Sequence, residues 1–479
     1  MSKLYVFGIG GTGSRVLRSL TILLAAGVDC GVDTIVPIII DRDMSNGDFS
    51  RAKLLVEDYI EVNRIADTKG KNRFFKTKIK LLNNELCLQL RDNTQKFNEF
   101  IGRNTMNAEN QALVDMLFSR ETLDLDMTAG FQGNPNIGSV VLNQFHDSDI
   151  FKAFAADFRD GDKIFIISSI FGGTGASGFP LLRKILQTPN VKDASGNVMD
   201  NWGLVNKART GAISVLPYFN VSIATDGSLV NSDTFVDKAR AALSYYKTED
   251  KKLDTLYYIA DRNTTTYRHN KGGDAQKNDA HFVELAAALA ILDFVNPDRE
   301  TQNIHRDKEG NIDKTTYKEF GINANVPKID FSNLADETKR LIVNPLSRFF
   351  LFRSYMQYVF AKQYKHQPYA RKRFTGDFRQ TGIIRKIESV QTSFYDWLLE
   401  MEKQERKFSP FNPASKDAFD FVTGSTGLGT KSSGIFKNWA KVDNELNRQI
   451  SKTDKSLNDE SRFLELFYRT AESLINFKN

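Results

Sequence analysis

The sequence predicts an α/β protein: a Rossmann-like, doubly wound and mostly parallel sheet with a central buried helix, followed by a mainly helical C-terminal region. Two observations carry this prediction. Short apolar runs rich in β-branched residues alternate with helix-like segments through the N-terminal half, and glycine-rich segments follow two of these runs. Near-continuous apolar strands separated by helices are typical of a parallel sheet covered on both faces. Ligands of such sheets bind beyond the carboxyl ends of the strands.

The predicted elements follow the chain in order. Five strands are expected at 4–7, 34–40, 164–170, 211–216 and 255–260, and three helices between them at 14–26, 49–62 and 179–186. Segment 279–295 is the strongest helix signal, with Asp279 at its N-cap or in its first turn. This segment is apolar nearly all round, which predicts a helix buried inside a large protein.

Three regions are expected. Residues 1–295 should form the sheet domain with its central helix, 296–332 a polar insertion or linker, and 333–479 a helical, basic region. Within the last region, residues 423–434 are rich in Gly, Ser and Thr and are interpreted as a connector. Lys431 lies one place too late for a P-loop there.

Composition places limits on location and partners. The 479 residues include only two cysteines, Cys30 and Cys87, so a cytoplasmic protein without a disulfide framework is expected. No signal peptide is visible, and the apolar stretch 20–28 is too short to span a membrane. The five histidines and two cysteines show no metal-binding spacing, and the net charge of +6 does not by itself indicate nucleic acid.

The glycine segments are candidates for phosphate binding. The first is Gly8-Ile-Gly-Gly-Thr-Gly-Ser14 and the second is Gly172-Gly-Thr-Gly-Ala-Ser-Gly178. Glycines that end a strand and open a helix expose backbone N–H groups to an anion, and hydroxyls such as Thr12 and Ser14 add donors. A third segment, 129–138, is a candidate wall around a γ-phosphate. The alternative is that these glycines serve only strand–helix packing.

Two acids follow the second predicted strand. Asp41 and Asp43 stand at its end, where an acid often contacts a ribose or a hydrated Mg²⁺. A solvated turn with Asp43 capping the next helix remains the alternative.

These motifs resemble the tubulin/FtsZ superfamily. Gly172–Gly178 resembles its signature loop, with Phe171 in place of the first glycine and one residue added before Gly178. Gly133-Asn-Pro-Asn-Ile-Gly138 is similar to the γ-phosphate loop of FtsZ, and Gly8–Ser14 fits the first loop of the family. The order along the chain also agrees. The resemblance and the glycine chemistry together assign these residues to nucleotide binding: Gly10, Gly11, Thr12, Gly13, Ser14, Asp41, Asp43, Gly133, Asn134, Gly138, Gly172, Gly173, Thr174, Gly175, Ala176 and Ser177.

The resemblance implies a divergent, prokaryotic tubulin-like protein that binds GTP or GDP with Mg²⁺. Residues 1–295 would be its nucleotide-binding domain, and 296–332 would contain the candidate catalytic loop. Asn263, or failing it Asp261, would contact guanine, and His281 lies near the second base contact of the family. The family implies GTP hydrolysis completed by head-to-tail self-association, and a cytoskeletal type of polymer. Asp330, in Ile-Asp-Phe-Ser-Asn-Leu, matches the first hydrolytic acid of FtsZ, and Asp298 is its rival.

Other functions stay open. Residues 362–386 combine eight Lys or Arg with interleaved aromatics, a pattern found in single-strand nucleic-acid binding and also in solvated helix faces. The stretch from Asp41 to Arg51 also resembles ThiF-like and ubiquitin-activating adenylyltransferases. A third alternative is a non-catalytic, nucleotide-stabilised scaffold whose C-terminal helices bind a protein partner. The alternative for Asp330 is that it is the N-cap of a helix that starts near Asn333.

Overall fold

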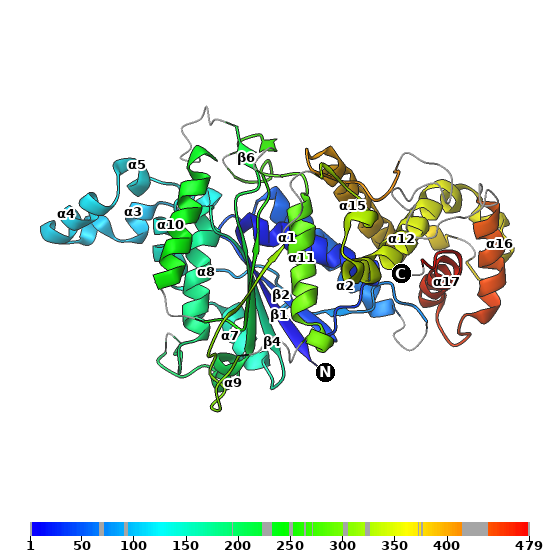
Figure 1. Ribbon diagram of the computed structural model, residues 1–479, viewed down its shortest axis with the longest axis horizontal. Coiled ribbons are helices and arrows are strands. Elements are labelled where there is room, and N and C mark those ends of the chain that lie inside the picture. The colour runs from blue at the N-terminus through cyan, green and yellow to red at the C-terminus, as the bar shows by residue number, and fades with distance from the viewer. Residues whose placement is uncertain are drawn as a thin grey trace.

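A seven-stranded sheet organises the molecule. The structure, a computed structural model, describes residues 2–66, 71–90, 94–193, 195–222, 232–248, 252–262, 265–270, 272–299, 305–320, 326–371, 373–374, 377–413 and 439–477 (Figure 1). The strands run in the order β3-β2-β1-β4-β5-β7-β9. Their bounds are β1 Lys3–Ile9, β2 Thr34–Ile40, β3 Lys78–Ile79, β4 Lys163–Ser169, β5 Arg209–Val215, β7 Thr255–Ile259 and β9 Thr316–Phe320.

Every strand pairing in this sheet is parallel. The chain moves outward from β1 in one direction and from β4 in the other, so the topological switch point lies between these two neighbours. A doubly wound sheet binds its ligands at this point, beyond the carboxyl ends of the strands. The predicted fold class is confirmed.

Helices cover both faces of the sheet. Figure 1 shows α8 and α10 on one face and α1 and α11 on the other. The helices around the sheet are α1 Gly10–Ala25, α2 Gly47–Ile65, α6 Pro135–Leu142, α7 Asp149–Asp157, α8 Gly173–Leu186, α9 Trp202–Lys207, α10 Phe235–Thr248 and α11 Phe282–Phe294. Helix α11 is apolar all round and twelve of its residues are buried, as the sequence predicts for a central helix.

An arm projects from the sheet domain between β3 and α6. Its short helices are α3 Phe97–Phe100, α4 Ala108–Leu117 and α5 Arg120–Leu123. Figure 1 shows the arm extending beyond α10, on the side opposite the C-terminal region. The sequence analysis did not anticipate it.

The C-terminal region is mainly helical, as predicted. Its helices are α12 Asp336–Tyr355, α13 Ala361–Gln363, α14 Pro368–Arg371, α15 Gly382–Lys403, α16 Ala440–Gln449 and α17 Asp459–Leu474. Two small parallel pairs complete the fold: β6 Asn220–Val221 with β8 Thr266–Tyr267, and β10 Lys328–Ile329 with β11 Lys407–Phe408. The connector expected at 423–434 lies outside the described residues.

Three expectations need correction. The segment 296–332, expected to be a polar insertion, contributes a strand to the sheet, because β9 lies within it and pairs with β7 at the sheet edge. The glycines open helices as expected, but α1 and α8 begin at Gly10 and Gly173, before the expected starts at 14 and 179. The aromatic residues of segment 362–386 are buried in the C-terminal core and cannot stack on bases: Tyr364, Tyr369, Phe374 and Phe378. Single-strand binding by that pattern therefore has no support.

Candidate functional site

One cavity lies at the switch point of the sheet. Helix α1 begins directly after β1, and only three residues separate the end of β4 from α8, so both N-termini face the carboxyl edge of the two central strands. The cavity measures about 180 Å³. Sequence analysis assigned ten of the residues that line it: Gly10, Gly11, Thr12, Asp41, Asp43, Gly133, Gly172, Gly173, Thr174 and Gly175. Segments far apart in the chain therefore meet around one small space.

The N-termini of α1 and α8 lack side-chain caps. Their N-cap residues are Ile9 and Gly172, and neither provides a side-chain hydrogen bond to the first turn. By contrast, α2 and α6 also begin near the cavity and are capped by Asn46 and Asn134. The first four N–H groups of a helix need an acceptor, and the helix dipole makes that end electropositive. The two uncapped ends are suited to bind an anion.

The glycines divide into two groups. Gly11 and Gly172 line the cavity, and a Cβ on either would contact only one side-chain atom within 4 Å, at 3.5 Å. Gly10 lines it with a φ of +71°, which favours glycine. A Cβ on Gly13 would instead lie 2.4 Å from the backbone of Gly8, and one on Gly175 would lie 2.2 Å from the Ser169 carbonyl oxygen. Packing is thus the primary reason for glycine at 13 and 175.

The remaining residues assigned to phosphate binding do not line the cavity. Gly138 packs closely against Ser177, whose hydroxyl donates to the Gly173 carbonyl at 2.7 Å. Asn134 accepts from Asn136 N–H and Ile137 N–H as the cap of α6. Ala176 accepts a hydrogen bond from Tyr246 on its carbonyl, and Ser14 is fully buried. These residues lie behind those that line the cavity and hold its wall in place.

Two carboxylates lie in the cavity wall. Burial raises the pKa of Asp41 to about 7, and the neighbouring Asp43 carboxylate adds to the rise. Asp43 is held by the Ser45 N–H and hydroxyl on one oxygen and by the Gly273 N–H, at 2.8 Å, on the other. It therefore organises the turn before α2, while Asp41 presents a costly buried charge beside the uncapped helix ends.

Arg15 lines the cavity beside Thr12. It donates to Thr12 Oγ1 at 3.2 Å and forms ion pairs with Asp48 at 2.8 Å and Glu284 at 2.6 Å. Tyr218 completes this buried cluster by donating to Glu284. Because both carboxylates neutralise it, Arg15 positions Thr12 and supplies little free positive charge to the cavity.

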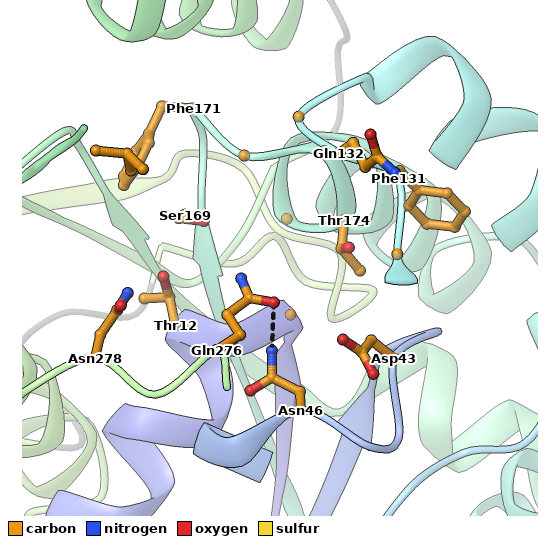
Figure 2. Close-up of a pocket in the computed structure, with 18 of the residues that line it drawn as sticks. Thr12, Asp43, Asn46, Phe131, Gln132, Ser169, Phe171, Thr174, Gln276 and Asn278 are labelled. Carbon is orange, nitrogen blue, oxygen red and sulfur yellow. Dashed lines mark hydrogen bonds between the residues drawn. The ribbon is translucent and has the colours of Figure 1, made fainter. Parts of the chain in front are cut away.

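Sequence reasoning missed the residues of the cavity rim. Asn46 donates to the Gln276 side chain at 2.9 Å, as Figure 2 shows, and Asn278 lies nearby. Arg268 and His269 line the same cavity from the segment after β8. The segment from 265 to 278 is polar and has no periodicity, so no sequence signal pointed to these positions.

The expected base contacts are not assembled in the described residues. Asn263 lies outside them. His281 does not line the cavity: it caps α11, its Nδ1 accepts from the Val283 N–H at 3.1 Å, and burial lowers its pKa to about 4. Asp261 is paired with Arg406 at 2.8 Å. His281 thus has a structural role as the N-cap of α11, and its contact with a base stays a prediction.

The candidate hydrolytic acids lie away from the cavity. Asp330 caps the 3₁₀ turn Phe331–Asn333, accepting from the Ser332 N–H at 2.8 Å. Asp298 lines a different cavity, beside Asp29 and Arg340. Neither lines the cavity at the switch point of its own copy.

Comparisons with known proteins are sparse. No family model matches the chain, and no curated protein matches its sequence. Among solved structures, CetZ from Methanosaeta thermophila strain DSM 6194 is 15% identical, with 62% of this chain and 54% of that chain covered and a TM-score of 0.29. CetZ2 from Haloferax volcanii, a GTPγS-bound protofilament, is 13% identical, with 64% and 63% covered and a TM-score of 0.29.

The match spans less than two thirds of either CetZ chain. At these identities and TM-scores the likeness does not indicate a function. Within the described residues, no helix is both long and apolar enough to cross a bilayer, and no cluster of three or more metal-ligating side chains is present.

Proposed function

We propose that this chain is a divergent tubulin/FtsZ-like protein that binds a guanine nucleotide at the switch point of its sheet. The observation that carries the proposal is the pair of uncapped helix N-termini, α1 and α8, at one small cavity. Its volume of about 180 Å³ is below the ~300 Å³ at which pockets usually enclose whole small molecules. It suits one part of a ligand, such as a phosphate chain.

The choice of guanine rests on the sequence resemblance. The three glycine segments that carry it, at Gly10, Gly133 and Gly172, all reach this cavity. An adenylyltransferase gains no specific support, because Arg51 of its motif does not line the cavity and is paired with Asp48 and Glu400.

Asp41 is the residue that would hold Mg²⁺. A buried carboxylate beside an anion site is unfavourable unless a cation lies between them, and Mg²⁺ is commonly held by one or two carboxylates plus phosphates. When bound, the ion neutralises phosphate charge. The backbone N–H groups of the first turns of α1 and α8 bind and orient the phosphate oxygens, and Thr12 and Thr174 offer hydroxyls at the same opening (Figure 2).

Hydrolysis would require a second copy. A residue that acts on the nucleotide of a neighbouring copy lies outside the cavity of its own chain, and Asp330 does so. A carboxylate in that position orients or polarises the attacking water. A second candidate function is a non-catalytic, nucleotide-stabilised scaffold. The Ser332 N–H and hydroxyl both donate to the Asp330 carboxylate, so this side chain already has a structural use as a cap.

Two measurements test the proposal. Nucleotide released from the purified, denatured protein and identified by chromatography should be GTP or GDP, and ATP or AMP would contradict it. Turnover per molecule should then rise with protein concentration. Asp330→Asn separates the two functions, because the amide oxygen can still cap the turn while the charge is lost.

In the GTPase, Asp330→Asn binds GTP normally and loses most of its turnover, whereas Asp298→Asn serves as the matched control and stays close to wild type. Nucleotide binding with no turnover at any protein concentration favours the scaffold.

A further inference from the structure

Helix α4, at the tip of the arm, exposes an apolar face. None of its ten residues is buried. Leu113, Met116 and Leu117 are 54%, 84% and 65% exposed. Their spacing of i, i+3 and i+4 places all three on one side of the helix. A contiguous exposed apolar face on a soluble protein marks an interaction site.

The arm is held away from the body by an ordered base. The Phe97 N–H donates to Leu125 O at 3.2 Å, and the Met127 N–H donates to Gln95 O at 2.8 Å. The rings of Phe97 and Phe118 pack edge to face at 5.0 Å. Helix α4 therefore presents its face at a fixed place beyond α10 (Figure 1).

A second cavity, lined by residues of α6, α8 and α10, has complementary chemistry. It measures about 390 Å³. Its lining includes Phe171, Pro180, Leu181 and Ala242, with Tyr245 half exposed in the same lining. Lys184 and Lys238 also line it, and the described residues of the lining include no acid.

We propose that α4 of one copy of this chain docks in this second cavity of another copy. Helix α4 carries no basic residue, and of its two acids Asp115 is paired with Arg103 of the arm at 2.6 Å, so Glu109, four residues before Leu113, is the charge that complements the two lysines of the cavity. Apolar anchors at i, i+3 and i+4 are the usual means by which a helix binds an apolar groove. The occupant is therefore an acidic, amphipathic helix, and α4 is one that every copy supplies.

The contact joins two different surfaces, so each copy can both give an arm and receive one. Such heterologous contacts build rings or open filaments. This contact is distinct from the one that Asp330 would make and goes beyond the proposed function.

The second cavity borders the candidate nucleotide site. Phe171 and Gly172 line both cavities. Lys238 Nζ also donates to the Gly133 carbonyl at 3.0 Å, and Gly133 belongs to the wall of the candidate nucleotide site. A docked helix would thus contact the residues that separate the two cavities.

Disulfide cross-linking tests the contact between copies. The two native cysteines are buried, so cross-links between copies should form almost entirely through the introduced cysteines. A Met116→Cys variant mixed with a Tyr245→Cys variant should give a cross-linked dimer under mild oxidation. The chain carrying both substitutions should give a ladder of higher oligomers.

The matched control replaces Tyr245→Cys by Leu204→Cys, on α9, where the side chain is 39% exposed. A mixture with Tyr245→Cys that cross-links no better than this control overturns the proposal. Cross-linking independent of protein concentration also overturns it, because the arm would then fold back onto its own chain.

Charge reversal is the second test of the contact. Glu109→Lys and Lys184→Glu should each weaken association by about tenfold in sedimentation velocity, and an equimolar mixture should restore it. Unchanged association in both variants overturns the proposal. Neither assay depends on nucleotide turnover, so the failure of this contact leaves the proposed function to its own tests.

Discussion

The buried carboxylate of Asp41 makes a quantitative prediction about pH. Its pKa rises from an ordinary 3.8 to about 7 in the folded protein, mainly through burial. A carboxyl with a raised folded-state pKa binds its proton more tightly when folded, so stability is lost as pH rises from about 4 to about 7. The difference of about three pH units corresponds to about 4 kcal/mol in full, and to ~2–3 kcal/mol between pH 5 and pH 8.

The assay compares wild type with Asp41→Asn. The free energy of unfolding is measured in denaturant at pH 5 and pH 8, without nucleotide or Mg²⁺. Asparagine cannot ionise, so the wild type should lose ~2–3 kcal/mol more than the variant between these pH values. Taking the difference between the two proteins removes the titration of all other groups.

The same pair of proteins tests the cation. At pH 8, Mg²⁺ with GTPγS should stabilise the wild type more than Asp41→Asn, because only the wild type carries the buried charge to be neutralised. Equal pH dependence in the two proteins would refute the assignment of a buried, ionising Asp41. An equal response to Mg²⁺ would refute its role in holding the ion.

Three further predictions concern the glycines of the first segment, Asp330 and Glu400. Gly11→Ala should weaken GTP binding at least tenfold in a titration with a fluorescent analogue. It should have the same melting temperature as the control Gly203→Ala, since the Cβ at position 11 meets only one atom, at 3.5 Å. Gly13→Ala should instead lower the melting temperature, because its Cβ would lie 2.4 Å from the backbone of Gly8. Asp330→Asn should keep its GTP affinity and lose turnover measured as phosphate release. Glu400→Gln should cost about 3–5 kcal/mol in denaturant unfolding, because it leaves the buried Arg18, paired at 2.5 Å, without its carboxylate and Arg51 with Asp48 alone; a loss below 1 kcal/mol would contradict this account.

The central strands were predictable because burial on both faces leaves a continuous apolar signal. The run at 34–40 matches β2, Thr34–Ile40, residue for residue. Strand β9, Thr316–Phe320, was missed because it lies at the sheet edge, where Tyr317 is 65% exposed and the apolar run is lost. The arm was missed for a similar reason, since α4 buries none of its residues.

The cavity was predictable only in part. Glycines at strand ends indicated where Gly10 and Gly172 would lie, but the sequence could not separate glycines that face a ligand from those, such as Gly13, that pack against backbone. Gln276 and Asn278 reach the rim through tertiary contacts of a polar segment, and such contacts leave no local pattern. His281 looked like a base contact by position, and its burial at the N-cap of α11 is a property of the fold.

Amide hydrogen exchange with and without Mg²⁺·GTPγS tests the central claim most directly. If the N-termini of α1 and α8 bind the phosphate chain, peptides covering 10–14 and 172–177 should exchange more slowly when the nucleotide is bound, because their first-turn N–H groups gain acceptors. Peptides from α16 and α17, in the C-terminal region, should be unchanged. Saturating nucleotide that leaves exchange at 10–14 and 172–177 unaltered would contradict the account.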